Sequence, residues 1–311
     1  MTKYPFEEKV EEFLVKRKDV LAETTYKGLE RRLYRIGGDL KDLRQDGKIS
    51  TLSPKSMTSE DVLAFIVFRK GKKVSFSDIS HDVSALKQVL TFAGNTAVQN
   101  CLAENIDILK RKKKPRLDPL SESTYNAILQ KYEEIDHQDF KTVRAYALSI
   151  LYIGTGARNK ELRLANRSDV DVVERTIHLE HVKGEDSWGA PRNVVIPKEI
   201  MPIVEQYLYD RDVYLAAHKA TSDALFFTLG GNFDHMSGNS IRRAKSIVEN
   251  DIGKRFEYRD CRRAYGQLYL GKGASIEQVS VAMGHASTET TETYYCRKSE
   301  SQVNRELKDL W

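Results

Sequence analysis

The chain has 311 residues, more than one hydrophobic core usually organises, so two domains are expected. Its residues are 40% hydrophobic and 31% charged, and no stretch approaches the roughly 20 apolar residues of a membrane-spanning helix, so a membrane protein is not expected. The net charge is +5, but residues 1–116 hold 24 Lys and Arg against 16 Asp and Glu, whereas residues 117–311 hold 26 against 29. A basic first part fits either the binding of a polyanion or an ordinary solvated surface.

The sequence begins MTKYPFEEKVEEF, a charged stretch without the apolar run and cleavage site of a secretory signal, so a cytoplasmic protein is expected. Cys101, Cys261 and Cys296 are widely spaced and odd in number, which favours reduced thiols over a disulfide framework or a zinc cluster. The seven histidines show no HExxH or comparable spacing, so neither a metal nor another cofactor is predicted.

Residues 1–110 are predicted to form a domain of four or five short helices. Apolar residues recur there at intervals of three and four in residues 6–14, 29–36, 62–66 and 83–90. The helix boundaries are indicated by a capping box of Thr58 with Asp61, an N-cap at Ser77 and a stop at Gly94. The domain lacks the residue types of an active site, so its predicted role is binding.

A basic linker is predicted at residues 111–119, after the helical domain. Six of the seven residues from Lys110 to Arg116 are basic, and prolines at 115 and 119 prevent helix continuation. A flexible charged tether and a segment lying against a phosphate backbone are compatible interpretations. The candidate phosphate-binding residues are Lys110, Arg111, Lys112, Lys113, Lys114 and Arg116.

The second domain, residues 120–298, is predicted to be mainly α-helical with a small β-sheet. Ser121 opens an amphipathic helix, and a longer apolar helix runs from Phe140 to Ile153. Alternating residues in Thr176–Val182 and Arg192–Ile196, separated by Gly and Pro, predict two strands joined by a turn. Helices follow from Lys198 onward, interrupted by a strand candidate at Ala224–Thr228.

Two candidate site residues lie in the first half of this domain. Gly154 and Gly156 should break the long helix, so that Arg158 emerges at the start of the next helix, where anions are favoured. An arginine at such a position is usually only a surface residue. Lys183 lies in the turn of the strand pair and is a candidate proton donor only if the other parts of a site exist.

Three more candidates follow. Arg262 is predicted to start a helix and Gly284-His285 to end another, although a lone histidine at a helix end more often interacts with the helix dipole. Tyr294 is one of 15 tyrosines, most of which are expected in the core. Because the free phenol has a pKa near 10, an attacking tyrosine needs cationic neighbours.

The ordered series Arg158, Lys183, Arg262, His285 and Tyr294 closely resembles the catalytic series of the tyrosine recombinase and phage integrase family. Local patterns of the family also match. The chain has TGxRxxEL at 155–162 and a lysine in the hairpin, and it has Met-Gly-His at 283–285 where the family has Leu-Gly-His. A tyrosine follows nine residues after this histidine. The resemblance covers about residues 118–298. It implies a two-domain, C-shaped clamp in which a helical core-binding domain precedes a tyrosine recombinase catalytic domain.

One departure from the family pattern concerns the base. The family usually has histidine, sometimes lysine, three residues before the second arginine, where this chain has Arg259. An arginine can donate hydrogen bonds to phosphate, but its very high pKa prevents it from acting as a general base. Which group takes the proton from Tyr294 is therefore open. Ala157 and Cys261 occupy positions at which the family commonly has leucine, and Arg263 occupies a position at which it commonly has histidine.

The resemblance also implies a mechanism. Arg158 and Arg262 would grip the scissile phosphate, with His285 and Arg259 completing the cradle and Glu161 orienting the arginines. Tyr294 would attack to give a 3′-phosphotyrosine and a free 5′-hydroxyl, and Lys183 would protonate that leaving oxygen, without ATP or metal.

The implied partner is double-stranded DNA. The resemblance also implies that the protein is a monomer or dimer when free and forms a homotetramer on two DNA sites. Its implied location is the cytoplasm, in association with the nucleoid. The segment 299–311 has Val303, Leu307 and Leu310 or Trp311 at helical spacing, for packing on its own domain or docking on a neighbouring subunit. Three alternatives remain: a type IB topoisomerase, a catalytically impaired DNA-binding protein of the same fold, and a metal nuclease.

Overall fold

The computed structural model describes residues 4–109, 118–184, 189–294, 304 and 307–308. The chain divides into two compact units, Met1–Pro115 and Arg116–Trp311. The six basic residues from Lys110 to Arg116 that were predicted to bind phosphate lie outside the described residues, and so does the apolar stripe of the tail apart from Leu307. Within the described part, no helix is both long enough and apolar enough to cross a membrane.

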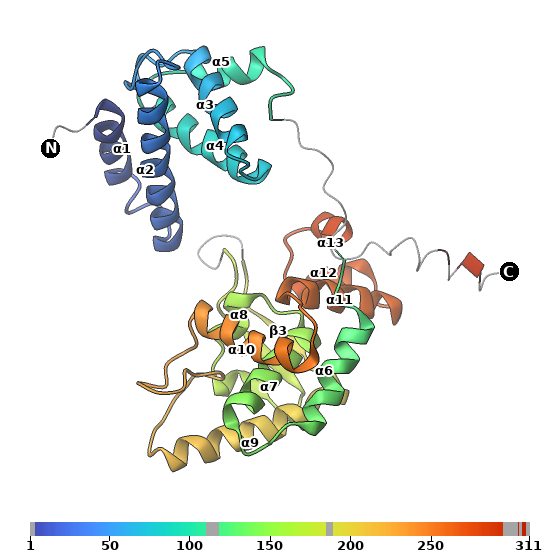
Figure 1. Ribbon diagram of the computed structural model, residues 1–311. Helices are drawn as coiled ribbons and strands as arrows, with labels where there is room; N and C mark the ends of the chain where they lie inside the picture. The colour runs from blue at the N-terminus through green and yellow to red at the C-terminus, as the bar shows by residue number, and fades with distance from the viewer. Residues whose placement is uncertain (1–3, 110–117, 185–188, 295–303, 305–306, 309–311) are drawn as a thin grey trace. The chain divides into compact units, whose positions relative to one another are not determined.

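Unit 1 is helical, as its periodicity predicts (Figure 1). Its described part holds five helices: α1 (Pro5–Val15), α2 (Glu23–Gln45), α3 (Ser59–Gly71), α4 (Phe76–Phe92) and α5 (Ala97–Glu104). The apolar stripes meet in one core that includes Phe13, Leu33 and Phe65. Burial of these stripes, rather than helix propensity, supplies most of the stability of such short helices.

The helix ends of unit 1 test three predicted signals. Thr58 Oγ1 accepts from the main-chain N of Asp61, whose carboxylate accepts from the main-chain N of Thr58, so the predicted capping box is confirmed. The N-cap predicted at Ser77 is wrong, because Ser75 has the extended backbone of a cap and accepts from Asp78 N. Gly94 follows the end of α4 with φ +77°, as a helix stop requires.

A buried ionic network ties three helices of unit 1 together. The carboxylate of Asp82 on α4 is fully buried and receives hydrogen bonds from Arg32 and Arg35 on α2 and, at 2.9 Å, from Arg69 on α3. Arg69 also donates to Asp39 at 3.0 Å. These contacts compensate the cost of burying both charge types, so removing one partner should be strongly destabilising.

Unit 2 is built around α7 (Phe140–Thr155), whose residues 143–155 are all buried. Around it pack α6 (Glu122–Glu134), α9 (Met201–Ala217), α10 (Gly238–Ile252) and α11 (Tyr258–Gly271). The remaining helices are α8 (Asn159–Arg163), α12 (Ile276–Met283) and α13 (Thr288–Tyr294), with short 3-10 turns at Arg167–Asp169 and Lys198–Ile200. A mostly apolar helix that is buried on all sides, as α7 is from residue 143 on, is expected at the centre of a domain.

The sheet of unit 2 is small and antiparallel. Its strands, β1 (Val170–Asp171), β2 (Thr176–Leu179) and β3 (Arg192–Val195), pair in that order. The two predicted strands are therefore found, and β1 is too short to show an alternation. The strand predicted at Ala224–Thr228 is wrong: this segment makes only isolated bridges, at Ala224 and Phe227, and does not form a continuous strand. Its apolar run reflects its burial.

The glycines after α7 shape the entry to the site. The prediction that Gly154 breaks the helix is wrong, because α7 continues to Thr155; Gly154 instead permits close packing, since a Cβ there would lie 2.2 Å from Ile200 Cδ1. Gly156 ends the helix with φ +59°, and a Cβ there would lie 2.7 Å from the ring of Tyr265. Both the left-handed backbone and the ring therefore require glycine at 156.

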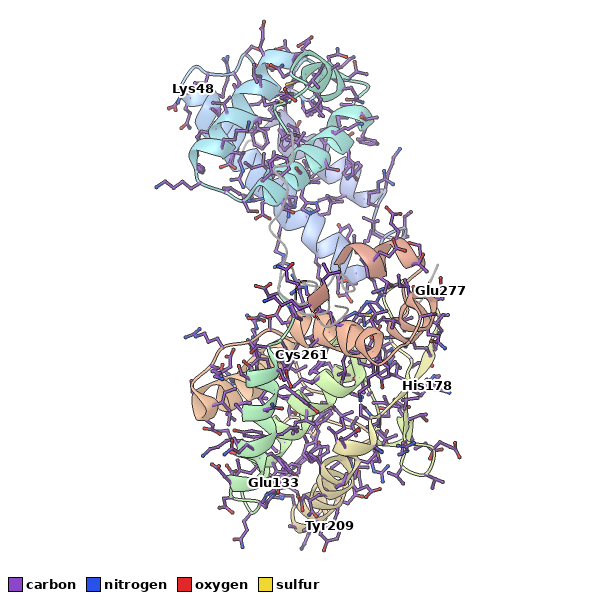
Figure 2. All side chains as sticks on the ribbon, turned by 90° about the vertical axis from the view of Figure 1, so that its right-hand side faces the viewer. Lys48, Glu133, His178, Tyr209, Cys261 and Glu277 are labelled. Carbon is purple, nitrogen blue, oxygen red and sulfur yellow. The ribbon has the colours of Figure 1, made fainter. Side chains whose placement is uncertain are left out.

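Two of the three cysteines lie in the described part. Cys101 and Cys261 are both buried and not disulfide-bonded. Cys261 lies in unit 2 (Figure 2). Burial raises the pKa of each thiol, which makes thiolate chemistry unfavourable. Cys296 lies outside the described residues.

Candidate active site

The C-terminal end of α12 gathers three arginines from distant parts of unit 2. Arg192, Arg262 and Arg158 donate, in that order, to the main-chain carbonyl oxygens of residues 282–284. Arg192 Nε lies 2.9 Å from the carbonyl oxygen of Ala282, and Arg158 Nη2 lies 2.9 Å from that of Gly284. A helix C-terminus leaves carbonyls unpaired at the negative end of its dipole, which attracts the multiple donors of a guanidinium group.

Gly284 makes this arrangement possible. It ends α12 with φ +62°, and a Cβ at this position would lie 2.8 Å from Nη1 of Arg192. A side chain here would therefore be strained by the backbone and would also push the guanidinium of Arg192 aside.

Arg158 is the N-cap residue of α8, at the helix N-terminus where it was predicted. Its main-chain N donates to Glu161 Oε2 at 2.7 Å, and its Nη1 donates to Glu161 Oε1 at 2.7 Å. The side chain is 23% exposed, so it is partly accessible to solvent. Capping by Glu161 fixes the turn from which Arg158 projects.

Glu161 holds two arginines at once. Its carboxylate is fully buried and accepts a forked pair of hydrogen bonds from Arg192, at 3.0 and 2.9 Å, as well as those from Arg158. Burial alone would raise the pKa of this carboxyl group, but the hydrogen bonds and charge of Arg192, together with those of Arg158, lower it to about 2. Glu161 is therefore ionised at neutral pH.

Arg262 lies in the second turn of α11, not at its start as predicted, because the helix begins at Tyr258. Its side chain is buried, and Nη1 donates to the carbonyl oxygen of Gly156 at 2.6 Å. Its Nη2 lies 3.0 Å from Nε2 of His285. The helix and two carbonyl groups thus hold Arg262 in one orientation beside Arg158.

His285 follows the end of α12, as predicted. Burial, and then the charges of Arg262 and Arg158, lower its pKa to about 3, so the ring is neutral near pH 7. A neutral ring makes no charge–dipole interaction with α12. Because Arg262 can only donate, Nε2 is the acceptor and the proton lies on Nδ1, which is 2.6 Å from Thr291 Oγ1.

The remaining predicted residues are less tightly placed. Lys183 is exposed in the turn after β2, beside residues 185–188, which lie outside the described part. Arg259 is exposed in the first turn of α11, one turn before Arg262. Tyr294 is the last residue of α13, and its side chain lies outside the described part. The structure thus brings together Arg158, Glu161, Arg262 and His285.

Arg192 was missed by the sequence reasoning, which treated it only as the start of a strand. A usable signal was present. Arg192, Val194 and Ile196 have the same parity along the strand, and the two apolar residues are buried. A charged residue with inward parity needs a buried partner, and Glu161 provides it.

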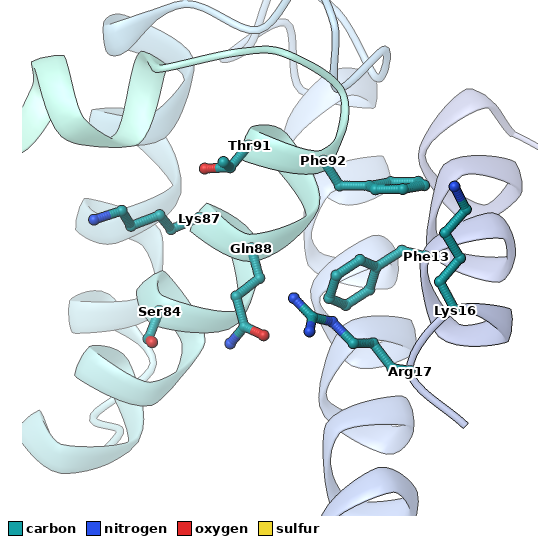
Figure 3. A pocket seen from close by; sticks show the side chains of 8 residues that line it. All are labelled: Phe13, Lys16, Arg17, Ser84, Lys87, Gln88, Thr91 and Phe92. Atoms are coloured by element: carbon teal, nitrogen blue, oxygen red, sulfur yellow. The ribbon is translucent and has the colours of Figure 1, made fainter. Parts of the chain in front are cut away.

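Unit 1 carries a basic groove between α1 and α4 (Figure 3). Its lining contains no carboxylate and consists of Phe13, Lys16, Arg17, Ser84, Lys87, Gln88, Thr91 and Phe92. The Lys16 ammonium lies 5.4 Å from the ring centre of Phe92, and the Arg17 guanidinium lies 5.1 Å from that of Phe13. Rings and cations together suit a polyanion.

Comparison with known proteins decides the family. Residues 118–301 match the model of the phage integrase family. The chain belongs to the phage integrase family. Membership supports a DNA strand-transfer enzyme acting in site-specific recombination. In addition, no group of three or more metal-binding side chains occurs in the part of the chain that the structure describes.

Relatives and solved structures agree with this assignment. The chain is 24% identical over 242 residues to the tyrosine recombinase XerA of Pyrococcus furiosus, covering 77% of this chain and 76% of XerA. It is 25% identical over 243 residues to XerC of a Roseiflexus species, covering 77% and 74%. The Tn1549 transposon integrase in complex with transposon right end DNA has a TM-score of 0.69 at 15% identity over 99% of both chains. The XerH recombinase bound to palindromic difH has a TM-score of 0.69 at 17% identity, covering 91% of this chain and 79% of that one.

Proposed function

We propose that the protein is a site-specific recombinase that cuts and rejoins duplex DNA through a 3′-phosphotyrosyl intermediate at Tyr294. The observation that carries the proposal is the convergence of Arg158 and Arg262 beside a neutral His285. Two guanidinium groups in one place are suited to the non-bridging oxygens of a phosphodiester, where charge develops during attack.

The reaction conserves the phosphodiester energy. A bond forms between the phenolic oxygen of Tyr294 and phosphorus, the bond to the 5′ oxygen breaks, and Lys183 gives its proton to that oxygen. Arg259 cannot accept a proton, and His285 with a pKa near 3 is a poor base. We therefore assign ionisation of the phenol to stabilisation of the phenolate by the arginines, with the proton leaving to solvent.

DNA binding is assigned to both units. The groove of Lys16, Arg17 and Lys87 in unit 1, the basic run from Lys110 to Arg116, and the arginine cluster of unit 2 would each bind phosphates of the duplex. The similarity to the solved structures of the Tn1549 integrase and XerH, both in complex with DNA, supports duplex DNA as the partner. A homotetramer on two DNA sites completes the proposal.

The test is a two-site assay on DNA from the gene's own genomic neighbourhood. The wild type should produce recombinant junctions without ATP and in the presence of EDTA, and Tyr294→Phe should bind the same DNA without recombining it. Relaxation of supercoiled DNA without two-site products would favour a type IB topoisomerase. DNA binding without any strand cutting would favour an impaired DNA-binding protein.

A further inference from the structure

We propose that Arg192 is a positioning residue which occupies both oxygens of Glu161 and so leaves Arg158 available to the scissile phosphate. The inference rests on the proposed function of this site. Arg192 does not belong to the series of residues expected to contact DNA. Its side chain nevertheless donates three hydrogen bonds within the arginine cluster, one to Ala282 and two to Glu161.

Hydrogen bonds around Glu161 define the role. Oε1 accepts from Arg158 Nη1 at 2.7 Å and from Arg192 Nη1 at 3.0 Å, while Oε2 accepts from the Arg158 main chain at 2.7 Å and from Arg192 Nη2 at 2.9 Å. Arg192 thus supplies two of these four donors. Without it, the buried carboxylate would compensate its lost partners by taking a second hydrogen bond from the Arg158 guanidinium.

The charges lead to the same conclusion. Arg158, Arg192 and Arg262 are positive, Glu161 is negative and His285 is neutral, so the cluster has a net charge of +2. Attack of a phenolate on a phosphodiester creates a transition state with two negative charges. Loss of Arg192 would lower the net charge from +2 to +1 and leave the carboxylate against Arg158, where it would oppose the approach of phosphate.

Arg192 is held where it can act only indirectly. Its side chain is 10% exposed, and its Nε donates to the carbonyl oxygen of Ala282. The missing Cβ of Gly284 leaves the space that its guanidinium fills. Strand β3, which pairs with β2 at Leu179, fixes its backbone. The three hydrogen bonds that the structure describes for Arg192 all go to the protein, which is the geometry of a residue that positions Arg158.

The experiment compares Arg192→Ala with the double variant Arg192→Ala/Glu161→Gln. The single-turnover rate of covalent complex formation is measured on a nicked suicide substrate, with DNA affinity and melting temperature measured in parallel. Arg192→Ala should slow the rate about 100-fold, as for loss of a preorganised donor, with little change in DNA affinity. The double variant should recover about tenfold of this loss, because a neutral amide cannot hold Arg158 by charge.

The control is Lys141→Ala, which removes one positive charge from the exposed far end of α7, about 20 Å along the helix from the site, and should leave the rate unchanged. A purely structural role for Arg192 would make the double variant no faster than the single one, and that result would overturn the proposal. A wild-type rate in Arg192→Ala would also overturn it.

If Arg192→Ala does not fold, Arg192→Lys and Arg192→Lys/Glu161→Gln provide the same comparison, since lysine keeps the charge but loses the fork. Rescue by Glu161→Gln is again the expected result, and its absence again overturns the proposal. A wild-type protein that forms no covalent complex on any suicide substrate would instead contradict the proposed function itself, and the role of Arg192 with it.

Discussion

The Nδ1 atom of His285 lies 2.6 Å from the hydroxyl oxygen of Thr291, a fully buried side chain one helical turn before Tyr294. This contact joins the end of α12 to α13. A hydroxyl can donate or accept, so Thr291 supports either neutral form of the ring. With Arg262 donating to Nε2, Nδ1 donates to Thr291; when Nε2 donates to a phosphate, Thr291 can donate to Nδ1.

Replacement of Thr291 tests this relationship. Thr291→Val keeps the shape but removes the hydroxyl, so the rate of covalent complex formation should fall about tenfold, the value of one hydrogen bond. Thr291→Ser should retain most of the wild-type rate. The measurement is single-turnover cleavage of a suicide substrate, and equal rates for the Val variant and the wild type would show that the contact has no part in the reaction.

The pH dependence should show no titration of His285 in the neutral range. Its pKa is lowered from 6.5 to about 3, so the neutral ring persists in the folded protein across about pH 5 to 8. The cleavage rate should therefore lack an inflection from His285 in this range. An inflection near pH 6.5 that disappears in His285→Asn would contradict the assignment.

The same shift affects stability. The unfolded chain binds a proton at His285 near pH 6.5, whereas the folded protein does so only near pH 3. The contribution of His285 to stability is therefore complete above pH 6.5 and is lost as the pH falls towards 3. Urea unfolding of the wild type and His285→Asn at several pH values should show the wild type losing more stability in this interval.

Gly284→Ala should cost both stability and activity. Its left-handed backbone strains any side chain, and the new Cβ would displace Arg192. The matched control is Gly253→Ala, which has φ +65° but nothing within 4 Å of the new Cβ. Gly253→Ala should lose about 1 kcal/mol of unfolding free energy and keep the cleavage rate. Gly284→Ala should lose more than this and cleave slowly; identical behaviour of the two variants would contradict the role given to Arg192.

Asp82→Ala should destabilise unit 1. It leaves the buried Arg69 without one of its carboxylate partners, at a cost of about 3–5 kcal/mol. Asp78, one turn earlier on α4 and 52% exposed, provides the control, since Asp78→Ala removes an equal charge from the surface. Denaturant unfolding measures both variants, and comparable losses would show that the buried network contributes little.

Much of the fold and part of the site can be predicted from the sequence because local patterns encode them. Periodicity locates the helices, and helix ends indicate Arg158 and His285. Boundaries are less certain where two serines two residues apart, such as Ser75 and Ser77, could each cap a helix. The apolar run at Ala224–Thr228 shows that hydrophobicity reports burial rather than strand pairing.

Contacts between residues that are far apart in the sequence cannot be predicted from local patterns. Arg192 and Glu161 are 31 residues apart, and neither shows its partner in its own neighbourhood. Their pairing follows from the way the hairpin and α8 both meet the end of α12. The same holds for the three arginines, which come from α8, β3 and α11 and meet at carbonyl groups that no side-chain pattern can reveal.

Identification of the residue covalently bound to DNA tests the central claim most directly. The trapped complex would be digested with protease and nuclease, and the modified peptide sequenced by mass spectrometry. We predict a 3′-phosphonucleotide on Tyr294, a free 5′-hydroxyl on the other DNA end, and no adduct in Tyr294→Phe. An adduct on Tyr295 or on any other residue, or one that persists in Tyr294→Phe, would contradict the account.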